Sequence, residues 1–479
     1  MYDVLIIGAG VTGAMIARNL ARYQLSVALL DKENDVGNLT SNANSAIIHS
    51  GYDPVPGTLK AKFNVLGNKM YDKIADELDV HFFRYGSLTV ALYEEQLPIL
   101  EDLAKRSAEN GVEVKLLTGE EVKAMEPNIN PCVKGALLAP TAGVIDPFNL
   151  VVHAVENAVD NGVKLFLNEE VVNITKTKDK FLVLTKKTEF EAKVVINAAG
   201  AFSDKIAAMF EPIDWHIIPR KGEYFVLDHF APGFVNHTIF PLPSEKGKGI
   251  LVTMTSSGNY LVGPSSEVTN EPDDYTTDKL TLDNIRKQAT DMVPNIPFNQ
   301  VIRVFSGVRP TPSTHDFIIS YSKKDNHFIN VAGIESPGLV SAPAIGEYVV
   351  EELVKPLFPE IKENKSYNPR VKKYNVVYDM SFEERQALVE KDPDYGKIIC
   401  NCEHIPLGQI KDVLSRSVPP HSVKGVKRRV RAGYGKCQGG FCQPSIVLLL
   451  AKHYGISPLE VSYDQEDSPI ILEKVKEVK

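Results

Sequence analysis

The sequence predicts three parts: an α/β domain of the Rossmann type that binds a dinucleotide, an α+β domain built on an antiparallel sheet, and a small C-terminal domain that holds a cysteine cluster. Three observations indicate this architecture. A strand, a glycine turn and a helix open the chain. Alternating apolar runs, broken by Gly and Pro, fill residues 213–264 and are typical of antiparallel strands. Four of the five cysteines lie between Cys400 and Cys442.

Charge and composition exclude several classes of protein. The 53 basic and 61 acidic residues give a formal net charge of -8, so we expect no nucleic-acid partner and no general affinity for an anionic membrane. The longest apolar stretches, such as residues 446–451, are far shorter than the roughly 20 residues of a membrane span. The first residues lack the pattern of an export signal. We therefore expect a cytoplasmic protein with no membrane span, in which clustered cysteines favour metal ligation over disulfides.

The glycine turn follows an apolar run at residues 3–7 and precedes a helical pattern. Gly8 permits the tight turn, Gly10 lets a pyrophosphate approach the backbone, and Gly13 allows close helix packing. The phosphates would lie at the positive end of the helix. Asp31 ends the next apolar run, where its carboxylate can accept hydrogen bonds from a ribose. The pattern predicts a dinucleotide site but does not choose between FAD and NAD, and a glycine turn without a ligand is the alternative.

Apolar periodicity also predicts the elements between these motifs. Helices are expected at residues 64–80 and 94–111, and a strand at residues 82–92. The other expected elements are a helix and strand within 147–167, strands within 180–199, and strand and glycine signals at 328–338 followed by a helix to about residue 354.

Five short motifs stand in a fixed order within residues 1–355. They are the glycine turn, Asn44-Ser-Ala-Ile-Ile-His49-Ser-Gly-Tyr-Asp-Pro, Asn197-Ala-Ala-Gly200-Ala-Phe-Ser-Asp204, Ser306-Gly-Val-Arg309-Pro and Gly333-Ile-Glu-Ser-Pro-Gly338-Leu. In this order they resemble the FAD-dependent family with the amino-acid oxidase-like fold, and within it the glycerol-3-phosphate and L-2-hydroxyglutarate dehydrogenases. The resemblance implies an FAD-binding Rossmann-like domain, a substrate domain, and tightly held FAD as the first electron acceptor.

The resemblance assigns the FAD contacts to the glycine turn, Asp31 and three later segments. Short hydroxyl and amide side chains in the first segment suit a flavin edge, and small residues in the second let the backbone approach a bulky ligand. The third segment opens a helix whose positive end would stabilise the reduced ring. A polar loop, a plain strand end and a capped helix are the structural alternatives. The expected cofactor residues are Gly8, Gly10, Gly13, Asp31, Thr40, Ser41, Asn42, Ser45, Ala199, Gly200, Gly333, Ser336, Gly338 and Leu339.

The same resemblance assigns the reacting side chains. His49 is the expected catalytic base, because a histidine pKa lies near the operating pH, although a structural histidine is the alternative. Arg309 is expected to act in catalysis and to bind the anionic group of the substrate in two parallel hydrogen bonds, and a structural salt bridge is its alternative. Arg220 and Lys248 match weaker segments and are further candidates for substrate binding.

The segments around His49 and at residues 219–224 look more like the glycerol-3-phosphate branch. We therefore expect oxidation of sn-glycerol 3-phosphate to dihydroxyacetone phosphate by hydride transfer to FAD. An L-2-hydroxyglutarate or related 2-hydroxy-acid dehydrogenase and an oxygen-using glycerol-3-phosphate oxidase are alternatives. A non-catalytic redox sensor or scaffold is an alternative of another class.

Cys400, Cys402, Cys437 and Cys442 provide four thiolates, which suit either a zinc ion or a [2Fe–2S] cluster. Their segments resemble the bacterioferritin-associated-ferredoxin-like [2Fe–2S] domain, which implies an iron–sulfur cluster and an electron-accepting redox protein as partner. Gly439 and Gly440 are expected to bring backbone N–H groups towards sulfur. A basic run precedes Cys437 and is expected to form a solvated face, or to compensate cluster charge and dock an acidic partner: Lys424, Lys427, Arg428, Arg429 and Arg431.

These signals give a domain division in which each of the first two domains is discontinuous. It assigns 1–80, 140–210 and 305–358 to the FAD-binding domain, 81–139 and 211–304 to the substrate domain, 359–394 to a linker, and 395–465 to the cluster domain.

Overall fold

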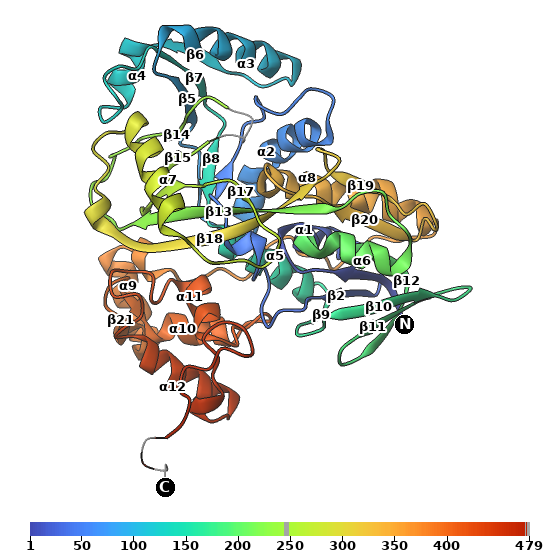
Figure 1. Cartoon of the computed structure of the whole chain (residues 1–479). Coiled ribbons are helices and arrows are strands. Elements are labelled where there is room, and N and C mark those ends of the chain that lie inside the picture. Colours follow the sequence, from blue (N-terminus) through green and yellow to red (C-terminus); the bar gives the residue numbers. More distant parts are fainter. Residues whose placement is uncertain (244–248, 475, 477–479) are drawn as a thin grey trace.

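The computed structural model describes residues 1–243, 249–474 and 476, and all statements about the fold refer to these residues. Figure 1 shows two large sheets that meet near the middle of the molecule, with the C-terminal helices gathered below them. The expected α/β flavin-binding fold with an antiparallel substrate sheet and a small C-terminal domain is confirmed in outline.

The first sheet has eight strands and contains the start of the chain. Its parallel core runs in the order β20, β12, β1, β2 and β9, and antiparallel strands extend it. The core strands are buried because helices cover both faces, as is usual for parallel sheets. The strands are β1 (Tyr2–Ile7), β2 (Val27–Leu30), β9 (Lys164–Phe166), β10 (Val171–Lys176), β11 (Phe181–Thr185), β12 (Glu189–Asn197), β19 (Ile318–Tyr321) and β20 (Phe328–Ala332).

Three helices beside this sheet pack unusually close to one another. A Cβ at Gly67 would stand 1.9 Å from the Val340 carbonyl oxygen, and a Cβ at Gly346 would stand 2.8 Å from the Met15 backbone. The helix expected at 64–80 begins earlier because the Thr58 hydroxyl caps it. The helices of this part are α1 (Val11–Leu20), α2 (Leu59–Glu77), α5 (Pro147–Asp160), α6 (Ser203–Phe210) and α8 (Gly338–Tyr348), which continues as the π-helical η5 (Val349–Val354).

The second sheet has nine strands and carries the longest ladder, between β13 and β18. The expected antiparallel pairing holds except between β14 and β5, which run parallel because a long crossover separates them. Helices α3 (Leu97–Glu109), α4 (Gly119–Met125) and α7 (Lys279–Met292) lie with this sheet in Figure 1. The strands are β5 (Ser87–Ala91), β6 (Lys115–Thr118), β7 (Gly135–Ala139), β13 (Ile217–Leu227), β14 (Thr238–Phe240), β15 (Leu251–Met254), β16 (Tyr260–Gly263), β17 (Glu267–Val268) and β18 (Val301–Pro312).

Short elements connect these layers. A small sheet consists of β3 (Ile47–Ile48), β4 (Phe82–Phe83) and β8 (Gly143–Ile145). The short 3-10 turns are η1 (Thr40–Asn42), η2 (Glu94–Gln96), η3 (Gly200–Phe202), η4 (Phe298–Gln300), η6 (Lys355–Leu357), η7 (Val377–Asp379), η8 (Pro393–Gly396) and η9 (Pro458–Glu460).

The C-terminal part has its own apolar core, to which Ile410, Val426 and Leu450 contribute. The preceding segment, 359–394, includes one helix without a buried residue, α9 (Phe382–Lys391). The remaining elements are β21 (Ile398–Cys400), β22 (Ile405–Pro406), α10 (Leu407–Leu414), α11 (Val423–Val430) and α12 (Gln443–Tyr454).

A buried ion pair fastens α11 to the loop after β2. The two terminal nitrogens of Arg429 donate to the two Asp35 oxygens, each at 2.8 Å, and Arg428 approaches the same carboxylate at 3.3 Å. Burial alone would raise the pKa of Asp35, but the two guanidiniums outweigh it and lower that pKa to about 2. Lys427, Arg428 and Arg429 are 3–6% exposed. The expectation of a solvated basic face is therefore wrong for these residues, because α11 packs with this run against the flavin-binding part.

A second contact ties the segment before the cluster domain to α5. The Tyr374 ring stacks on His153 at 4.0 Å between ring centres, and its hydroxyl donates to Glu156 Oε2 at 2.8 Å. The Arg416 guanidinium lies over the Tyr374 ring, 3.3 Å from its centre. The cluster domain is thus joined to the flavin-binding part through two separate buried polar contacts.

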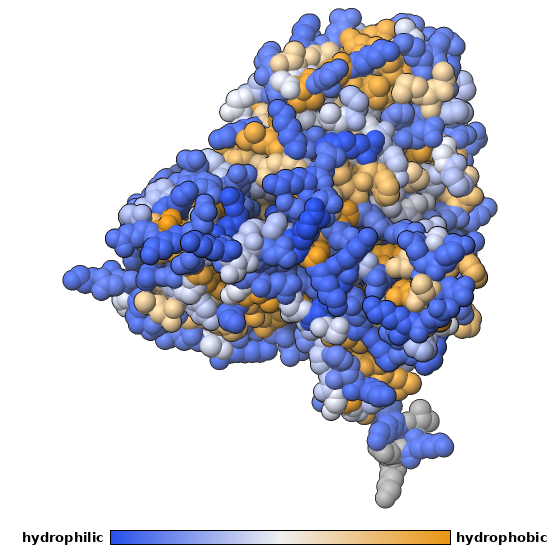
Figure 2. Space-filling view, turned by 180° about the vertical axis from the view of Figure 1, so that it is seen from behind, coloured by the Kyte–Doolittle hydropathy of each residue, from blue (hydrophilic) through white to orange (hydrophobic). Residues whose placement is uncertain are grey.

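The surface in Figure 2 is largely hydrophilic, with separate apolar areas between the charged residues. Among the described helices, none combines the length and the apolar character that a membrane crossing requires.

Asp35→Asn tests the buried ion pair. We expect the free energy of unfolding to fall by about 3 kcal/mol, because Arg429 is left without its carboxylate in a buried site, while Arg428 keeps Asp464. Denaturant-induced unfolding measures this change. Asp76→Asn is the matched control, since its pair with Arg370 is exposed and contributes little.

The pH dependence supplies a second readout of the same substitution. The pKa of Asp35 is about 2 in the folded protein and about 3.9 in an unfolded chain, so its stabilisation is complete above about pH 4 and is lost as the pH falls towards 2. The wild-type protein should lose stability more steeply in this window than Asp35→Asn. Equal slopes would contradict the role of this ion pair.

Candidate active site and cluster site

The glycine turn after β1 leaves no room for larger residues. Gly8 has a φ of +106°, and a Cβ there would stand 2.4 Å from the Ala198 carbonyl oxygen. A Cβ at Gly13 would stand 1.9 Å from the Gly8 carbonyl oxygen. Gly10 is the N-cap of α1 and has no side chain of its own, so the amino end of that helix presents backbone to a ligand except at the Val11 N–H, which Ser41 caps. This cradle fits a pyrophosphate at the positive end of α1.

Asp31 is braced against the glycine turn. One carboxylate oxygen accepts from the Ala9 N–H at 2.7 Å, and the other accepts from the Glu33 N–H at 2.9 Å. Burial raises the pKa of Asp31 to about 6 in spite of these two hydrogen bonds. Further donors, such as ribose hydroxyls, would lower that pKa again. The environment of this carboxylate therefore fits a hydroxyl-bearing ligand.

The loop at residues 40–45 is held between the turn and the second sheet. The Ser41 hydroxyl accepts from the Val11 N–H at 2.9 Å, and the Thr40 hydroxyl donates to the Val308 carbonyl at 2.8 Å. The Ser45 and Tyr224 hydroxyls lie 3.0 Å apart. These contacts place the loop across β13 and β18. Asn42 lies at the end of η1 and lines a cavity beside this loop.

Ala199 and Gly200 follow β12, and the space where Gly200 would carry a Cβ is open. The backbone at this strand end is therefore accessible to a large ligand. At Gly333, φ is +66°, and a Cβ would stand 2.6 Å from Pro312. Gly200 has a φ of +55°, so both glycines adopt a left-handed backbone conformation that other residues rarely adopt.

The turn from Gly333 to Gly338 is fixed by Glu335. This carboxylate accepts from the Thr311 hydroxyl and from Lys60 Nζ, each at 2.7 Å. Ser336 precedes a cis proline, and Gly338 begins α8. The Leu339 carbonyl accepts a hydrogen bond of 2.5 Å from the Tyr71 hydroxyl, which holds the amino end of α8 in place.

His49 lies where the two large sheets approach each other. It follows β3, and its carbonyl accepts from the side-chain amides of Asn64 at 2.7 Å and Asn68 at 3.0 Å. Its ring is half-buried, with its centre 5.8 Å from that of Phe240, the last residue of β14. The backbone of His49 is therefore fixed by α2, and its ring faces the second sheet.

Arg220 and Arg309 stand directly opposite each other on β13 and β18. Directly paired residues of antiparallel strands share one face of the sheet. Both guanidiniums approach the Ser266 hydroxyl, at 3.5 and 3.4 Å, and Arg309 also donates to the Ser265 carbonyl at 3.2 Å. Two cations on one face, held by neutral partners, suit an anionic group. Lys248, the other expected substrate residue, lies outside the described residues.

The four clustered cysteines lie as two pairs. The sulfurs of Cys402 and Cys437 are 3.7 Å apart, and Cys400 and Cys442 hydrogen-bond each other in the interior. The Cys442 thiol and backbone N–H groups outweigh burial and lower the pKa of Cys400 to about 6. A [2Fe–2S] cluster has two irons that each take two thiolates. Four cysteines arranged as two pairs therefore fit this group.

Backbone N–H groups surround the sulfurs as the sequence predicts. Burial alone would raise the pKa of the Cys437 thiol, but the N–H groups of Phe441, Gly439 and Gly440 and the Cys402 thiol lower it. A Cβ at Gly435 would stand 2.3 Å from Cys402 Cβ. Such N–H groups stabilise negative charge on sulfur.

Comparison with known proteins agrees with these two sites. A family model described as FAD dependent oxidoreductase matches residues 3–352, and one described as BFD-like [2Fe-2S] binding domain matches residues 398–452. The chain belongs to the FAD-dependent oxidoreductase family. The predicted cofactors, FAD and a [2Fe–2S] cluster, are thereby confirmed, and the protein is a flavin-dependent oxidoreductase.

Among its relatives, a glycerol 3-phosphate dehydrogenase from Caloramator mitchellensis is 45% identical over 98% of each chain. A glycerol 3-phosphate oxidase from Mycoplasma pneumoniae is 34% identical over 76% of this chain and 98% of its own length. A solved structure of the dithionite-reduced, FAD-bound L-alpha-glycerophosphate oxidase from the same organism has a TM-score of 0.74 and 32% identity, and the match covers 77% of this chain and 98% of that one.

Sequence reasoning missed several residues that position the site. Tyr224 binds Ser45, and Glu335 joins the α8 turn to β18, although both stand inside motifs that the sequence singles out. Ser265 and Ser266 hold the two arginines and carry no motif of their own. Only the pairing of β13, β17 and β18 brings these serines to the arginines.

Proposed function

We propose that this protein oxidises sn-glycerol 3-phosphate to dihydroxyacetone phosphate and passes the electrons through its C-terminal cluster to a redox protein. The observation that carries this proposal is the 45% identity to a glycerol 3-phosphate dehydrogenase over 98% of both chains, cluster domain included. The paired arginines on one face of the second sheet support an anionic substrate. A cytoplasmic location remains a prediction.

The proposed roles follow from the positions of the side chains. Arg309 and Arg220 bind the phosphate and thereby orient C2 of the substrate. A ring nitrogen of His49 takes the proton from the C2 hydroxyl as the C2 hydride leaves. FAD, when bound, supplies the acceptor for this hydride. Lys248 remains a further proposed substrate residue.

The proposed FAD contacts come from the segments described above. The glycine turn binds the pyrophosphate, Asp31 binds the ribose, and the amino end of α8 faces the flavin. The full proposed set is Gly8, Gly10, Gly13, Asp31, Thr40, Ser41, Asn42, Ser45, Ala199, Gly200, Gly333, Ser336, Gly338 and Leu339. The division into an FAD-binding domain, a substrate domain, a linker and a cluster domain is proposed with it.

An oxygen-using oxidase is the second candidate, because relatives of that name are 34–36% identical. Their matches cover only 76% of this chain, whereas the match to the dehydrogenase covers 98%. A cluster carries one electron at a time, which suits a protein acceptor and is not needed for reduction of oxygen. The added cluster domain therefore favours a dehydrogenase.

An anaerobic titration of the FAD-loaded protein tests the substrate. Flavin absorbance is followed while glycerol 3-phosphate or L-2-hydroxyglutarate is added. We expect bleaching by glycerol 3-phosphate only. Bleaching by L-2-hydroxyglutarate alone would move the protein to the related branch, and no bleaching by either would favour a non-catalytic role. Stoichiometric hydrogen peroxide in air would favour the oxidase.

His49→Asn should keep FAD bound but slow flavin reduction by about 10²- to 10⁴-fold, because the hydroxyl proton loses its acceptor. Stopped-flow absorbance at saturating substrate measures the rate. His453→Asn on the exposed side of α12 is the control and should behave like the wild type. A near-normal rate in His49→Asn would show that another group is the base.

Arg309→Gln should weaken the apparent affinity for glycerol 3-phosphate by about 10- to 100-fold, as expected for the loss of a charged hydrogen-bond donor. The rate at saturation should also fall, because the anion aligns C2. Arg286→Gln on the exposed face of α7 is the matched control. An unchanged affinity would place the anion elsewhere, and Arg220→Gln is then the next variant.

Cys437→Ser should prevent cluster assembly, so that metal analysis finds about two irons per chain in the wild type and few in the variant. Substrate should still bleach FAD at close to the normal rate, while turnover with a one-electron protein acceptor is lost. Cys132→Ser, far away in the sequence and exposed, is the control. Stoichiometric zinc in the wild type, or full turnover in Cys437→Ser, would contradict this electron route.

A further inference from the structure

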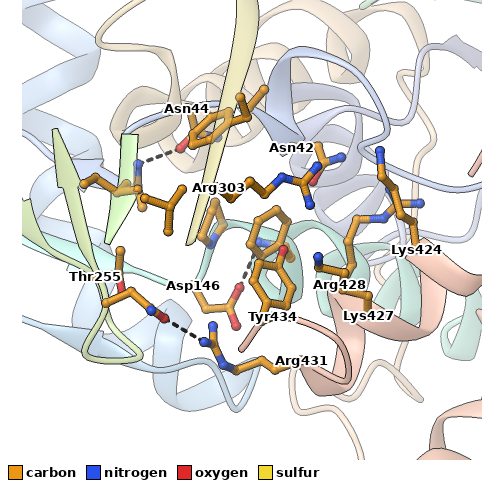
Figure 3. A pocket seen from close by; sticks show the side chains of 18 of the residues that line it. Asn42, Asn44, Asp146, Thr255, Arg303, Lys424, Lys427, Arg428, Arg431 and Tyr434 are labelled. Carbon is orange, nitrogen blue, oxygen red and sulfur yellow. Dashed lines mark hydrogen bonds between the residues drawn. The ribbon is translucent and has the colours of Figure 1, made fainter. Parts of the chain in front are cut away.

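A cavity of about 360 Å³ lies between the flavin-binding part and the cluster domain. One wall comes from the loop at residues 38–46 and from β18, and the other comes from α11 and the loop that follows it. Figure 3 shows the side chains of Arg303, Lys427 and Tyr434 converging on this space from the two sides. Asn42, one of the proposed FAD contacts, also lines this cavity, but its charged side chains belong to no residue proposed to bind FAD or the cluster.

The lining carries more positive than negative side chains. Its carboxylates are Asp146 and Asp464, whereas five cations lie around it: Arg303, Lys424, Lys427, Arg428 and Arg431. The cations come from both parts of the molecule, with Arg303 on β18 and the others on α11 or directly after it.

Three of the cations have carboxylate partners. Lys424 and Arg428 both bind Asp464, at 2.8 and 3.0 Å, and Arg431 binds Glu403 at 3.0 Å. These ion pairs hold the walls of the cavity in place and neutralise part of its positive charge. The other two cations decide what the cavity can bind.

Lys427 and Arg303 have no acidic partner among the residues that the structure describes. The Lys427 ammonium donates to the neutral Gln438 Oε1 at 3.3 Å and lies over the Tyr434 ring, 4.6 Å from its centre. Lys427 is 6% exposed, and burial together with the charges of Arg303, Lys424 and Arg431 lowers its pKa to about 7. Two like charges that line one cavity are stabilised by an anion between them.

The rest of the wall suits the organic part of such a ligand. Tyr434 and Phe148 present aromatic surface, with ring centres 5.8 Å apart, and Asn42 and Thr255 present amide and hydroxyl groups. The volume lies within the range of about 300–1,000 Å³ that is usual for small-molecule sites. Inorganic phosphate would leave most of it empty.

We propose that this cavity binds a phosphorylated organic anion of about nucleotide size, with its phosphate between Lys427 and Arg303. The ligand contacts both the flavin-binding part and the cluster domain and therefore stabilises their docking. The proposal concerns a site separate from the paired arginines and does not rest on the proposed substrate.

Isothermal titration of the full chain, loaded with FAD and its cluster, tests this proposal with ADP as the probe. We expect saturable binding of ADP, weaker binding of inorganic phosphate, and none of adenosine. ADP should also raise the unfolding temperature, since it binds only the docked state. Glycerol 3-phosphate is added in a parallel titration to identify any overlap with the substrate site.

Lys427→Gln and Arg303→Gln should each weaken ADP binding by at least tenfold. Lys452→Gln on the exposed side of α12 is the matched control and should bind ADP normally. If Lys427→Gln does not fold, Arg303→Gln alone decides, because Arg303 is only half-buried.

Several outcomes would overturn the proposal. One is the absence of saturable ADP binding, and another is equal affinity for ADP in the variants and the wild type. Equal affinity for phosphate and ADP would reduce the cavity to a simple anion site. Loss of FAD from Arg303→Gln would assign the cavity to the flavin instead.

Discussion

The ladder between β13 and β18 is the interaction on which the rest of this molecule depends. It places Arg220 opposite Arg309 at one end and carries Arg303 at the other. Its middle lies so close to the loop at residues 40–45 that a Cβ at Gly307 would stand 2.2 Å from the Ala43 carbonyl oxygen. The proposed substrate site, the loop at residues 40–45 and the cavity beside the cluster domain therefore all contact one pair of strands.

The loop after β2 imposes a second constraint, because several functions meet in one short stretch. Asp31 braces the glycine turn, Asp35 binds the cluster domain, and Ser41 caps the Val11 N–H. His49 follows directly after β3. The stretch that binds the cluster domain is thus the same one that carries several of the proposed flavin contacts.

The sequence alone predicts the elements whose signals are local. The glycine turn, Asp31 after β2 and the clustered cysteines are recognised from their spacing in the sequence. Where the backbone needs a positive φ or a close approach, the sequence shows a glycine. The burial of Arg428 and Arg429 is not predictable in this way, since a basic run on a helix normally faces solvent and only a distant carboxylate, Asp35, reverses that expectation. The serines that hold the arginines escape prediction for the same reason: they become neighbours only through strand pairing.

Buried charges explain how the cluster domain docks on the flavin-binding part. Buried ion pairs contribute little net stability, but they penalise every arrangement that leaves one partner unpaired. The contacts of Asp35 with Arg429 and Arg428 therefore select one placement of α11 against the flavin-binding part rather than simply adding to stability. In that placement Lys427 and Arg303 line one cavity, and neither has a carboxylate partner among the described residues. An anion at this junction would offset the positive charges that the docking brings to one cavity.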